Sequence, residues 1–586
     1  MQDFEERFAD RHLLHSVVDK WAREKPAATA LIDTLSGRRV SWLEFAIFTR
    51  ALARLLRERG LRRGDVFATV LPLTSEHIFL EYACFRIGAI FVPLDLRLSR
   101  AELMRSLEQV PPAAFAFSSK TPALREAEDI CRELRERFAP RLLLHFATDE
   151  PCPTGADDDR EFLQRAAQIA HESAASGALP AEEQVTENDG ALVIFTTGST
   201  GSPKPALLSH RNISCQAMCL SQGLLRGSDE YAANAFGTAP VADAVGYAAT
   251  ERRSGRSAGE LVTLVNLPPS HVGCQTELLM STIFDGGTAV LIPIFDPLRS
   301  VRAIADYKVT AIGQIPAMFQ FEWRLKEWGS FDLASLKLAV YGGQQVSPAF
   351  MSKMAEMAPK VGTGLGLTEA AGFCTYIRTP SARAAECAAS LGVDMPVYPM
   401  TIREEMQASR AAGKELKDGE LGYVCFRGPQ TFLGYINDPE ATKAAISTDG
   451  YLYTGDMGYR DAAGLHLAGR AKLIIKPSGY QVFPGDVESH FAALEGLSQC
   501  AVVGVPHPIT TEAIVAFIEL QPGSQIEIAQ LQRHARGLAV YMRPYHYVLL
   551  GPGELPLNRV AKADYMRLRE RARSEMESLA KHGGYA

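Results

Sequence analysis

The stretch Ala191-Leu192-Val193-Ile194-Phe195 runs directly into Thr196-Thr197-Gly198-Ser199-Thr200-Gly201-Ser202-Pro203-Lys204-Pro205. A continuous apolar run of this length is typical of a buried strand in an α/β sheet. The polar run after it offers backbone N–H groups, hydroxyls and one lysine, which favours a loop that binds the phosphates of a nucleotide. It is not a Walker A loop, because Gly198 lacks a Gly-Lys-Ser/Thr at the required spacing. A solvent loop rich in turn formers is the alternative.

The flanking sequence alternates helical stretches with short apolar strands. Residues 44–60 carry apolar side chains at helical spacing and end at a glycine, and the apolar segments 65–72 and 81–95 follow. The alternation resumes beyond residue 262 and continues to about residue 469. This order predicts an α/β fold with mostly parallel strands.

Two stretches rich in small and polar residues interrupt the pattern. Residues 152–188 are predicted to be a loop-like connection before the strand at residue 191, and residues 225–260 a surface excursion without chemistry. Near the end of the chain, apolar strands at 501–506, 514–520 and 545–550 alternate with helical stretches. That segment is predicted to be a separate small α+β domain.

Composition excludes several classes of protein. The 586 residues carry a formal charge of -7, with no basic block, so nucleic acid is not an expected partner. No apolar run approaches the roughly 18 residues of a membrane span, and the acidic start does not resemble a signal peptide, which predicts a cytoplasmic protein without a transmembrane segment. The ten cysteines are scattered, and the close pair Cys215 and Cys219 has no second pair, which favours reduced thiols over zinc.

The loop at 196–205 resembles the phosphate loop of the adenylate-forming superfamily, which includes acyl-CoA synthetases, adenylation domains and luciferases. The resemblance covers nearly the whole chain. Further motifs follow in the family's order and spacing: residues 91–95 (FVPLD), 366–369 (GLTE), 419–422 (GELG), 427–429 (RGP), 434–435 (GY), 453–456 (YTGD), 469–472 (GRAK) and 555–562 (LPLNRVAK). The resemblance implies a large N-terminal α/β domain of the adenylate-forming type and a small C-terminal α+β domain.

The resemblance also implies a reaction in two steps that uses ATP, Mg²⁺ and a thiol. A carboxylic acid forms an acyl-adenylate, and coenzyme A or the phosphopantetheine of a carrier protein then captures the acyl group. Glu369 would bind Mg²⁺, Thr368 would contact the α-phosphate, and Asp456 and Arg470 would hold the ribose. The nucleotide would further contact Thr196, Thr197, Gly198, Ser199, Thr200, Gly201, Lys204 and Leu365. A helix cap at Thr368 and Glu369 and a turn at Asp456 are the structural alternatives.

The C-terminal motifs imply a mobile domain. Lys562 matches the family's catalytic lysine, whose ammonium can touch both the carboxylate and the phosphates. Lys472 would be the hinge, which places the domains at residues 1–471 and 472–586. After rotation, Lys476, Ser478 and Gly479 would line the channel for CoA, whereas a simple hairpin turn is the alternative for this loop.

The acyl pocket would be lined by His271 and Val272 and, on the opposite wall, by Gly342, Gly343 and Gln344. Amino-acid-activating members carry an Asp where His271 stands, and this chain has no acidic residue there until Glu277, so an α-amino acid is disfavoured. A histidine of the core is the alternative for His271. The glycines leave room for the methylenes of an apolar, fatty acyl tail.

Three departures from the family pattern are Pro205 and Ala561, which replace glycines, and Leu365, which stands where an adenine-stacking aromatic is common. The leading hypothesis is an acyl-CoA synthetase for a fatty or similar hydrophobic acid. A stand-alone ligase that loads a carrier protein is the second hypothesis, although the ordinary length of residues 369–456 favours CoA. A catalytically poor adenylate-binding protein is the third, motivated by the three departures. Chain length, alkyl or aryl tail, pathway and oligomeric state stay open.

Overall fold

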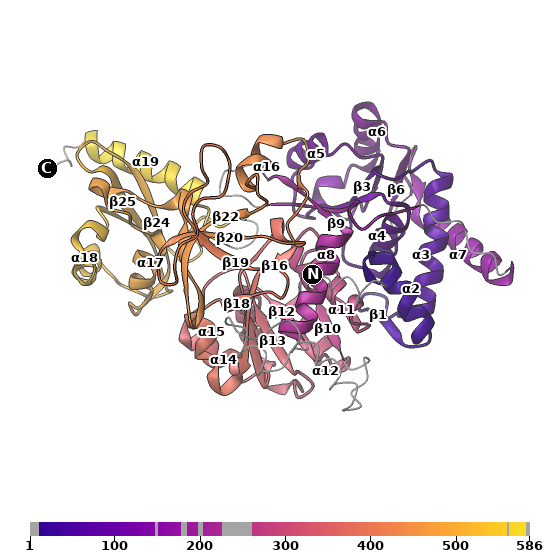
Figure 1. Cartoon of the computed structure of the whole chain (residues 1–586), viewed down its shortest axis with the longest axis horizontal. Helices are drawn as coiled ribbons and strands as arrows, with labels where there is room; N and C mark the ends of the chain where they lie inside the picture. The colour runs from indigo at the N-terminus through magenta and orange to yellow at the C-terminus, as the bar shows by residue number, and fades with distance from the viewer. Residues whose placement is uncertain are drawn as a thin grey trace.

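The computed structural model describes residues 11–146, 151–176, 184–196, 203–225, 261–558 and 562–581. Figure 1 shows a large body that contains the N-terminal and central parts of the chain and a smaller C-terminal body beside it. The stretch at 226–260, which the sequence predicts to be a surface excursion, lies outside the described residues. No helix among the described residues is both long and apolar enough to cross a membrane.

Two sheets of mostly parallel strands form the larger body. The first has the order β21 (Gly434–Tyr435), β9 (Pro205–Ser209), β8 (Gly190–Phe195), β4 (Ile90–Pro93), β3 (Val66–Val70), β5 (Ala114–Phe117), β6 (Leu142–His145) and β7 (Asp157–Asp158). The second has the order β18 (Val393–Asp394), β17 (Thr375–Pro380), β14 (Lys360–Thr363), β13 (Leu338–Tyr341), β12 (Ala311–Gln314), β10 (Val262–Val265), β11 (Thr288–Leu291), β1 (Thr29–Asp33) and β2 (Arg39–Ser41). The mixed α/β fold expected from the sequence is confirmed.

One core joins the two sheets, because helices between them bury residues against both. These are α2 (Leu14–Glu24), α3 (Trp42–Glu58), α4 (Ser75–Ile87), α8 (His210–Leu220), the π-helix η4 (Gly273–Met280) and α11 (Ser281–Phe284). A second core covers the outer face of the second sheet with α12 (Pro297–Asp306), α13 (Pro316–Trp323), α14 (Pro348–Ala355) and α15 (Ala385–Ala389). A third covers the outer face of the first sheet with α5 (Arg100–Gln109) and α6 (Ala127–Phe138).

The connection expected at residues 152–188 is in part a helix, which corrects the sequence prediction. Residues Asp159–Ser176 form α7. Phe162, Ala166 and Ile169 lie on one face of this helix and are buried in the core that also contains α3. The alanines and polar residues that look like a loop in the sequence therefore form a helix, because three side chains at helical spacing reach a hydrophobic core.

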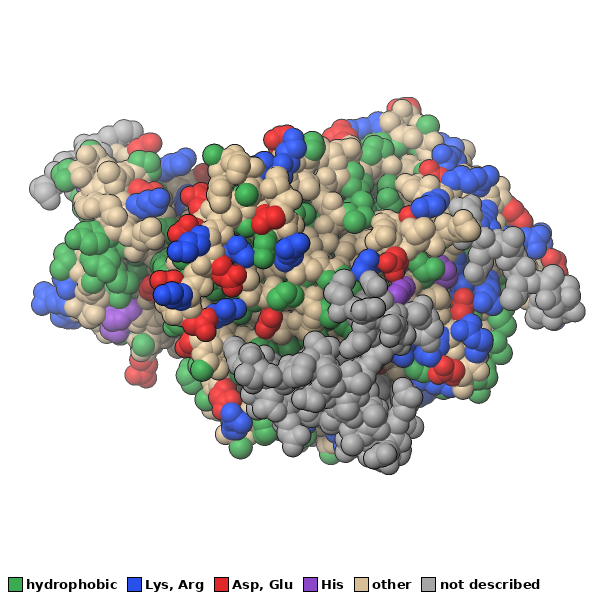
Figure 2. Space-filling view, viewed as in Figure 1, with side chains coloured by type: hydrophobic (Ala, Val, Ile, Leu, Met, Phe, Trp, Pro, Cys, Tyr) green, Lys and Arg blue, Asp and Glu red, His purple; other side chains and the backbone are tan. Residues whose placement is uncertain are grey.

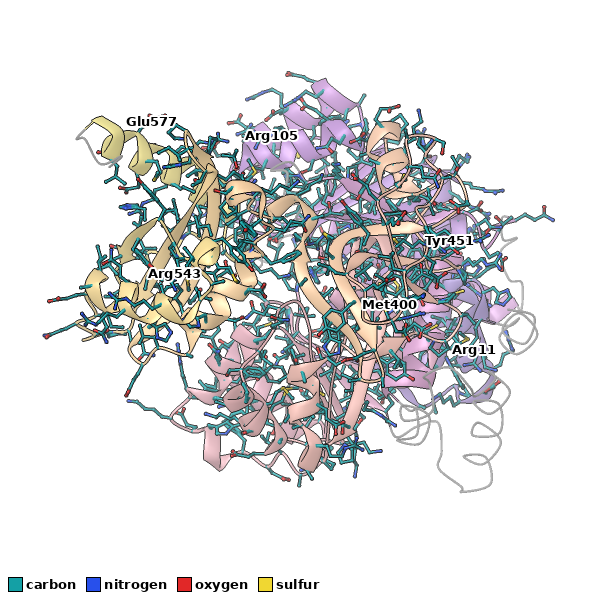
Figure 3. The ribbon with its side chains drawn as sticks, turned by 60° about the vertical axis from the view of Figure 1, so that its left-hand side comes forward. Arg11, Arg105, Met400, Tyr451, Arg543 and Glu577 are labelled. Carbon is teal, nitrogen blue, oxygen red and sulfur yellow. The ribbon has the colours of Figure 1, made fainter. Side chains whose placement is uncertain are left out.

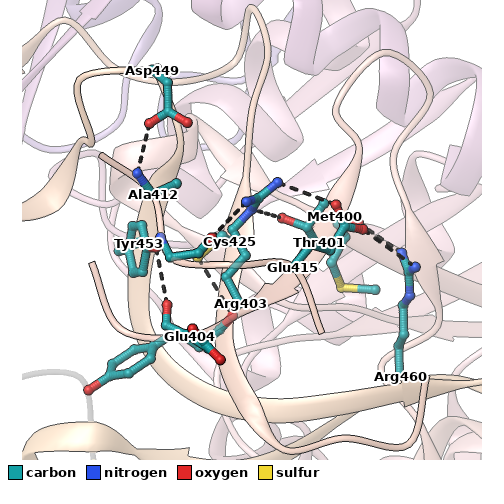
Figure 4. Close-up of polar contacts among 12 residues, drawn as sticks. Met400, Thr401, Arg403, Glu404, Ala412, Glu415, Cys425, Asp449, Tyr453 and Arg460 are labelled. Atoms are coloured by element: carbon teal, nitrogen blue, oxygen red, sulfur yellow. Dashed lines mark hydrogen bonds and ion pairs between the residues drawn. The ribbon is translucent and has the colours of Figure 1, made fainter. Parts of the chain in front are cut away.

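An antiparallel sheet connects the large body to the C-terminal one. It consists of β19 (Met400–Arg403), β20 (Gly422–Phe426), β22 (Leu452–Asp461) and β23 (Gly464–Arg470). Figure 4 shows the polar contacts that fix its outer part: Arg403 donates to Thr401 Oγ1 at 3.0 Å, and Arg460 donates to the Met400 carbonyl at 3.0 Å. The Arg403 guanidinium also lies 3.8 Å from the centre of the Tyr451 ring. The last strand of this sheet, β23, leads directly into the segment that begins the C-terminal body.

The C-terminal body is a small α+β domain, as the sequence predicts. Its sheet has β24 (Leu497–His507) and β25 (Thr511–Leu520) antiparallel and β26 (His546–Leu550) parallel to β25. One face packs against α17 (Pro484–Ala492) and α18 (Ile528–His534), and the other packs against α19 (Tyr565–Lys581). The three strands expected at 501–506, 514–520 and 545–550 are all present.

Candidate active site

A cavity of about 1410 Å³ lies between the large body and the C-terminal domain. Its walls include Arg105 of α5 and the side chains of Arg567 and Glu570 on α19. Figure 3 shows Arg105 on α5 and Glu577 on α19, which locates the two helices in the molecule. Both parts of the chain therefore contribute to one cavity.

Both ends of the segment 196–205 lie at the cavity, where the antiparallel strands β8 and β9 meet it. The N–H of Thr196 donates to the Lys204 carbonyl at 2.9 Å, which closes the base of the loop between β8 and β9. Thr197, Gly198, Ser199, Thr200 and Gly201 lie outside the described residues, while Thr196 and Lys204 line the cavity. Pro205 begins β9, a position where a strand tolerates proline, and its carbonyl accepts from Ile436 N–H at 2.9 Å.

Glu369 accepts a hydrogen bond from a tyrosine. The Thr-Glu motif forms the short 3₁₀ helix η6 (Thr368–Ala370), and both Thr368 and Glu369 line the cavity. The Tyr435 hydroxyl donates to Glu369 Oε1 at 2.5 Å, and the ring of Tyr435 lies 5.2 Å from Lys204 Nζ. Burial, and then the charge of Glu369, raise the pKa of the Tyr435 hydroxyl, so it stays protonated and can donate. Tyr435 thus joins the phosphate loop to the Thr-Glu motif.

Asp456 and Arg470 face each other across the hairpin of β22 and β23. Their Cα atoms are register partners, and Arg470 Nε lies 2.8 Å from Asp456 Oδ1. The second carboxylate oxygen, Asp456 Oδ2, is buried and has no hydrogen-bond partner among the described residues. Burial raises the pKa of Asp456, and the Arg470 charge opposes that shift. The pair therefore combines a cation with an acceptor oxygen that no described residue contacts by a hydrogen bond.

Lys562 brings an ammonium from the C-terminal domain into the same cavity. Its backbone N–H donates to Asn558 Oδ1 at 3.0 Å, and its side chain lines the cavity beside Gly343. A Cβ built on Gly343 would lie 3.8 Å from Lys562 Cε and 3.9 Å from Lys562 Nζ. Burial, and next the Arg470 charge, lower the pKa of Lys562, whereas Asp456 raises it. Ala561 lies outside the described residues.

His271, which is expected in the acyl pocket, also lines the cavity. Its Nδ1 accepts from Gly273 N–H at 3.0 Å, which leaves the proton of the neutral ring on Nε2. Burial, and then the Lys562 charge, lower the pKa of His271 to about 4, so the ring is neutral near pH 7.

The other residues expected in the acyl pocket divide into two groups. Val272, Gly342 and Gly343 line the cavity together with His271. Gln344 is exposed and is not among the described residues that line the cavity.

Leu365 packs in the main core, with 9% of its surface exposed, and is not among the lining residues. Phe373, four residues beyond Glu369, lines the cavity instead, and its ring would lie 3.4 Å from a Cβ built on Gly342. The contact of Leu365 with a nucleotide stays a prediction.

The residues expected to form the hinge and the CoA channel lie at the start of the C-terminal domain. Lys472 belongs to the 3₁₀ turn η8 (Ala471–Leu473), lines the cavity, and its carbonyl accepts from Arg569 of α19 at 3.2 Å. Lys476, Ser478 and Gly479 are exposed and are not among the described lining residues. In this arrangement of the domains, the loop expected to form the CoA channel therefore points elsewhere.

Tyr435, Phe373 and Glu277 are among the lining residues that the sequence did not assign to the site. Tyr435 was part of a quoted motif, but nothing local indicated that its hydroxyl meets Glu369. Phe373 lies close behind the Thr-Glu motif in the chain. Glu277 is an acid in the apolar segment CQTELLM, and an isolated charge in such a segment is a signal that could have found it.

Comparison with known proteins shows which family shares this arrangement. Residues 18–436 match the model of the AMP-binding enzyme family, and residues 486–562 match that of the AMP-binding enzyme C-terminal domain. A feruloyl-CoA synthase of Amycolatopsis sp is 28% identical over 510 residues, 86% of this chain and 88% of that protein.

A 3-[(3aS,4S,7aS)-7a-methyl-1,5-dioxo-octahydro-1H-inden-4-yl]propanoyl:CoA ligase of Mycobacterium tuberculosis is 29% identical over 569 residues, 96% of this chain and 99% of that one. Among solved structures, ATP-bound MatB from Rhodopseudomonas palustris superposes with a TM-score of 0.75 at 22% identity, and the match covers 96% of this chain and 99% of that one. The structural match supports the fold alone.

Proposed function

The chain belongs to the AMP-binding enzyme family as an AMP-forming acid–thiol ligase, and we propose that it joins a hydrophobic carboxylic acid to CoA. In the first step an oxygen of the carboxylate bonds to the α-phosphorus of ATP as the bond to pyrophosphate breaks. In the second step the sulfur of CoA bonds to the acyl carbon, loses its proton, and AMP leaves.

One observation carries this proposal: groups from both domains that suit the first step meet in one cavity. Lys562 of the C-terminal domain, Arg470 of the hairpin and Glu369 of the Thr-Glu motif all line it. Asp456 is paired with Arg470 but is not itself among the described residues that line the cavity. Two anions must meet for adenylation, and a lysine within their reach can stabilise the charge that develops between them. We therefore assign Lys562 as the residue that carries the adenylation step.

The nucleotide half has a defined set of donors and acceptors. Asp456 Oδ2, which is buried without a partner among the described residues, would accept from a ribose hydroxyl, and Arg470 would donate to the same sugar. Lys204 and Thr368 would contact the phosphates, together with the loop at 197–202.

Glu369 is suited to Mg²⁺, because this cation is usually bound by one or two carboxylates together with phosphate oxygens and water. The Tyr435 hydroxyl already holds Glu369 Oε1, which fixes the direction of the carboxylate. Bound there, Mg²⁺ would neutralise charge on the phosphates.

The acyl half is apolar, which supports a hydrophobic substrate. Leu224, Leu267, Leu278 and Val340 line it, and an apolar tail gains about 0.8 kcal/mol per buried CH₂. Two relatives are named for ferulate and for a bicyclic propanoate, both bulky acids. We propose an acid of similar bulk, alkyl or aryl, with its carboxylate at the end of the pocket formed by His271 and Lys562.

The thiol step would need a second arrangement of the domains. We propose that residues 472–586 rotate about Lys472, so that Lys476, Ser478 and Gly479 turn from the surface to the cavity and line the channel for CoA. A carrier-protein phosphopantetheine is the alternative acceptor. The cytoplasmic location stays a prediction from the sequence.

The test is ATP–pyrophosphate exchange across a panel of fatty, aryl and bicyclic carboxylic acids, followed by thioester detection with CoA or with a phosphopantetheinylated carrier protein. We expect exchange with at least one hydrophobic acid and thioester formation with CoA. If exchange occurs but the acyl group is transferred only to the carrier protein and not to CoA, the carrier protein is the acceptor. If the protein binds nucleotide but shows no exchange with any acid, it is an adenylate-binding protein and not a ligase.

A further inference from the structure

The wall of the acyl half carries a carboxyl that neither step of the proposed reaction uses. Glu277 lies in the π-helix η4 and lines the cavity beside Leu278. A π-helix is rare, and such widened turns occur often at functional sites, where they change the direction of a side chain. His271 precedes η4, and a Cβ built on Gly273 would lie 3.0 Å from His271 Nδ1 and 3.3 Å from Glu277 Oε2, so the two side chains line the same part of the wall.

Three glycines make room for this carboxyl. A Cβ built on Gly273 would lie 3.3 Å from Glu277 Oε2, one on Gly366 would lie 3.0 Å from Oε1, and one on Gly372 would lie 2.9 Å from Cγ. Each distance is at or below the limit of an ordinary contact, so a side chain at any of the three positions would press on the glutamate. Glycines from segments far apart in the sequence thus surround one acidic side chain, and their lack of a side chain leaves space for it.

Within the described parts of the chain, the Glu277 carboxyl has no hydrogen bond and no ion pair. The two acids of the nucleotide half do have partners: the Tyr435 hydroxyl donates to Glu369, and Arg470 forms an ion pair with Asp456. Burial raises the pKa of Glu277 to about 8, so the group is a neutral carboxylic acid near pH 7. Such a group offers one O–H donor and a carbonyl acceptor, and the half-buried Glu277 can present both to a ligand in the cavity.

We propose that Glu277 is a specificity residue that selects carboxylic acids whose tail carries a neutral oxygen, as a hydroxyl or keto group, over acids with purely alkyl tails. A hydroxyl can both donate to and accept from the neutral carboxyl, and a keto oxygen can accept its proton. This inference rests on the proposed function, because it names the substrate class of the same acyl pocket.

The groups around Glu277 bear on the two charged alternatives, a tail carboxylate and a tail ammonium. The titratable groups that face it are Cys374, whose thiol pKa is raised by burial and by Glu277 itself, and His271, whose pKa is lowered to about 4. Both are neutral near pH 7. A tail carboxylate would therefore meet no cation beside Glu277, and a tail ammonium would bind only together with ionisation of Glu277, whose pKa burial raises to about 8.

The first experiment measures ATP–pyrophosphate exchange with matched pairs of acids that share a skeleton and differ only in a tail hydroxyl or keto group. Wild-type enzyme is expected to favour the oxygenated acid by roughly 10–100-fold in kcat/KM, mainly through KM, because a site built to hydrogen-bond a group rejects the analogue that lacks it. Glu277→Leu should abolish or reverse this preference, and Glu277→Gln should keep it. Glu356→Gln, an exposed glutamate far from these residues in the chain, is the matched control and should leave the preference unchanged.

The second experiment uses the keto acids alone and varies pH. A keto oxygen needs a donor, so KM for the keto acid should rise in wild type as pH passes about 8 and Glu277 loses its proton. The amide of Glu277→Gln donates at every pH, so its KM should stay flat over the same range. A role of Glu277 in folding alone would not produce this difference between two folded proteins, which thermal melting would verify.

Several results would overturn the inference. Equal kcat/KM for alkyl and oxygenated acids, no change in Glu277→Leu, or a preference for amine-tailed acids would each show that Glu277 does not select a neutral oxygen, while exchange itself would leave the proposed function standing. Absence of exchange with every acid, in wild type and in Glu356→Gln alike, would overturn the proposed function and this inference with it.

Discussion

Asp456 and Lys562 show how burial prepares single residues for a charged ligand. Asp456 is 5% exposed, with one oxygen paired to Arg470 and the other without a partner in the described parts of the chain. Its pKa is raised and that of Lys562 is lowered, so burial disfavours the charged form of each group. A ligand that pairs with both groups would stabilise their charged forms. The same two residues can therefore contribute both to binding and to charge stabilisation.

Lys562→Ala should reduce adenylation by roughly 10²–10³ in rate, the size of one well-placed electrostatic group. Thioester formation from a preformed acyl-adenylate should remain largely intact, since the ammonium acts on the first step. Pyrophosphate exchange and single-turnover thioester formation measure the two steps separately. Lys326→Ala, at an exposed lysine outside the cavity, is the control. An equal fall in both steps would make Lys562 a structural residue.

The alkaline limb of the pH profile should report Lys562. Its pKa is lowered from that of an ordinary lysine, so adenylation should decline as rising pH removes its proton, at a lower pH than a free lysine would titrate. Lys562→Arg keeps its charge throughout, so its profile should lose this decline even though its rate is lower. The measurement is kcat/KM for pyrophosphate exchange against pH in both proteins. An identical alkaline decline in the arginine variant would assign the titration to another group.

The hairpin of β22 and β23 is the element that links nucleotide and hinge. It places Asp456 opposite Arg470 in register, and the chain passes from Arg470 directly into the 3₁₀ turn that contains Lys472. A bulge between Met457 and Gly458 interrupts the register beside Asp456. Such bulges often occur near functional sites, where they change the direction of a side chain.

Lys472→Pro should separate the two steps in the direction opposite to Lys562→Ala. Proline fixes φ near -65° and restricts the residue before it, which stiffens the turn that the second arrangement requires. Pyrophosphate exchange should survive, while thioester synthesis should fall strongly. Lys472→Ala removes the same side chain but leaves the backbone free, and both activities should persist in it. Retention of thioester synthesis by the proline variant would place the pivot elsewhere.

The whole molecule is built so that one part can move against the other. The two large sheets share a core with the helices between them, whereas the two cores of the C-terminal domain consist, among the described residues, of side chains from Ile475 onward. A part with its own cores can rotate as a unit. Figure 2 shows basic and acidic side chains interspersed over one face of the molecule, in keeping with the formal charge of -7.

Domain rotation can be followed by energy transfer between two labels. Leu35, which is 61% exposed, and Val540, which is 76% exposed, lie in the large body and in the C-terminal domain. Labels on Leu35→Cys and Val540→Cys, in a background with Cys152 and Cys500 replaced by Ser, should change their transfer efficiency when a non-hydrolysable acyl-adenylate analogue and CoA are added. Lys472→Pro should suppress the change. A constant efficiency in the parent protein would contradict rotation.

The sequence by itself determined the features that depend on neighbouring residues. The apolar run 191–195 before a loop of glycines and hydroxyls, the helical spacing of 44–60 and the ordered motifs from 366 to 562 were enough for the α/β fold, the small C-terminal domain and the family. Local periodicity indicates whether a segment forms a strand or a helix. The spacing of motifs can be read from the chain without knowing which residues they contact.

The tertiary structure alone decided which side chains meet and which are desolvated. Helix α7 forms where the sequence indicated a connection, because Phe162, Ala166 and Ile169 are buried in the main core. The tertiary structure also brought the Tyr435 hydroxyl to Glu369, turned Leu365 into the core, and left Glu277 among three glycines without a partner in the described chain. Packing between distant segments sets burial, and burial sets both the pKa of a group and the partners it lacks, so no local pattern could predict these features.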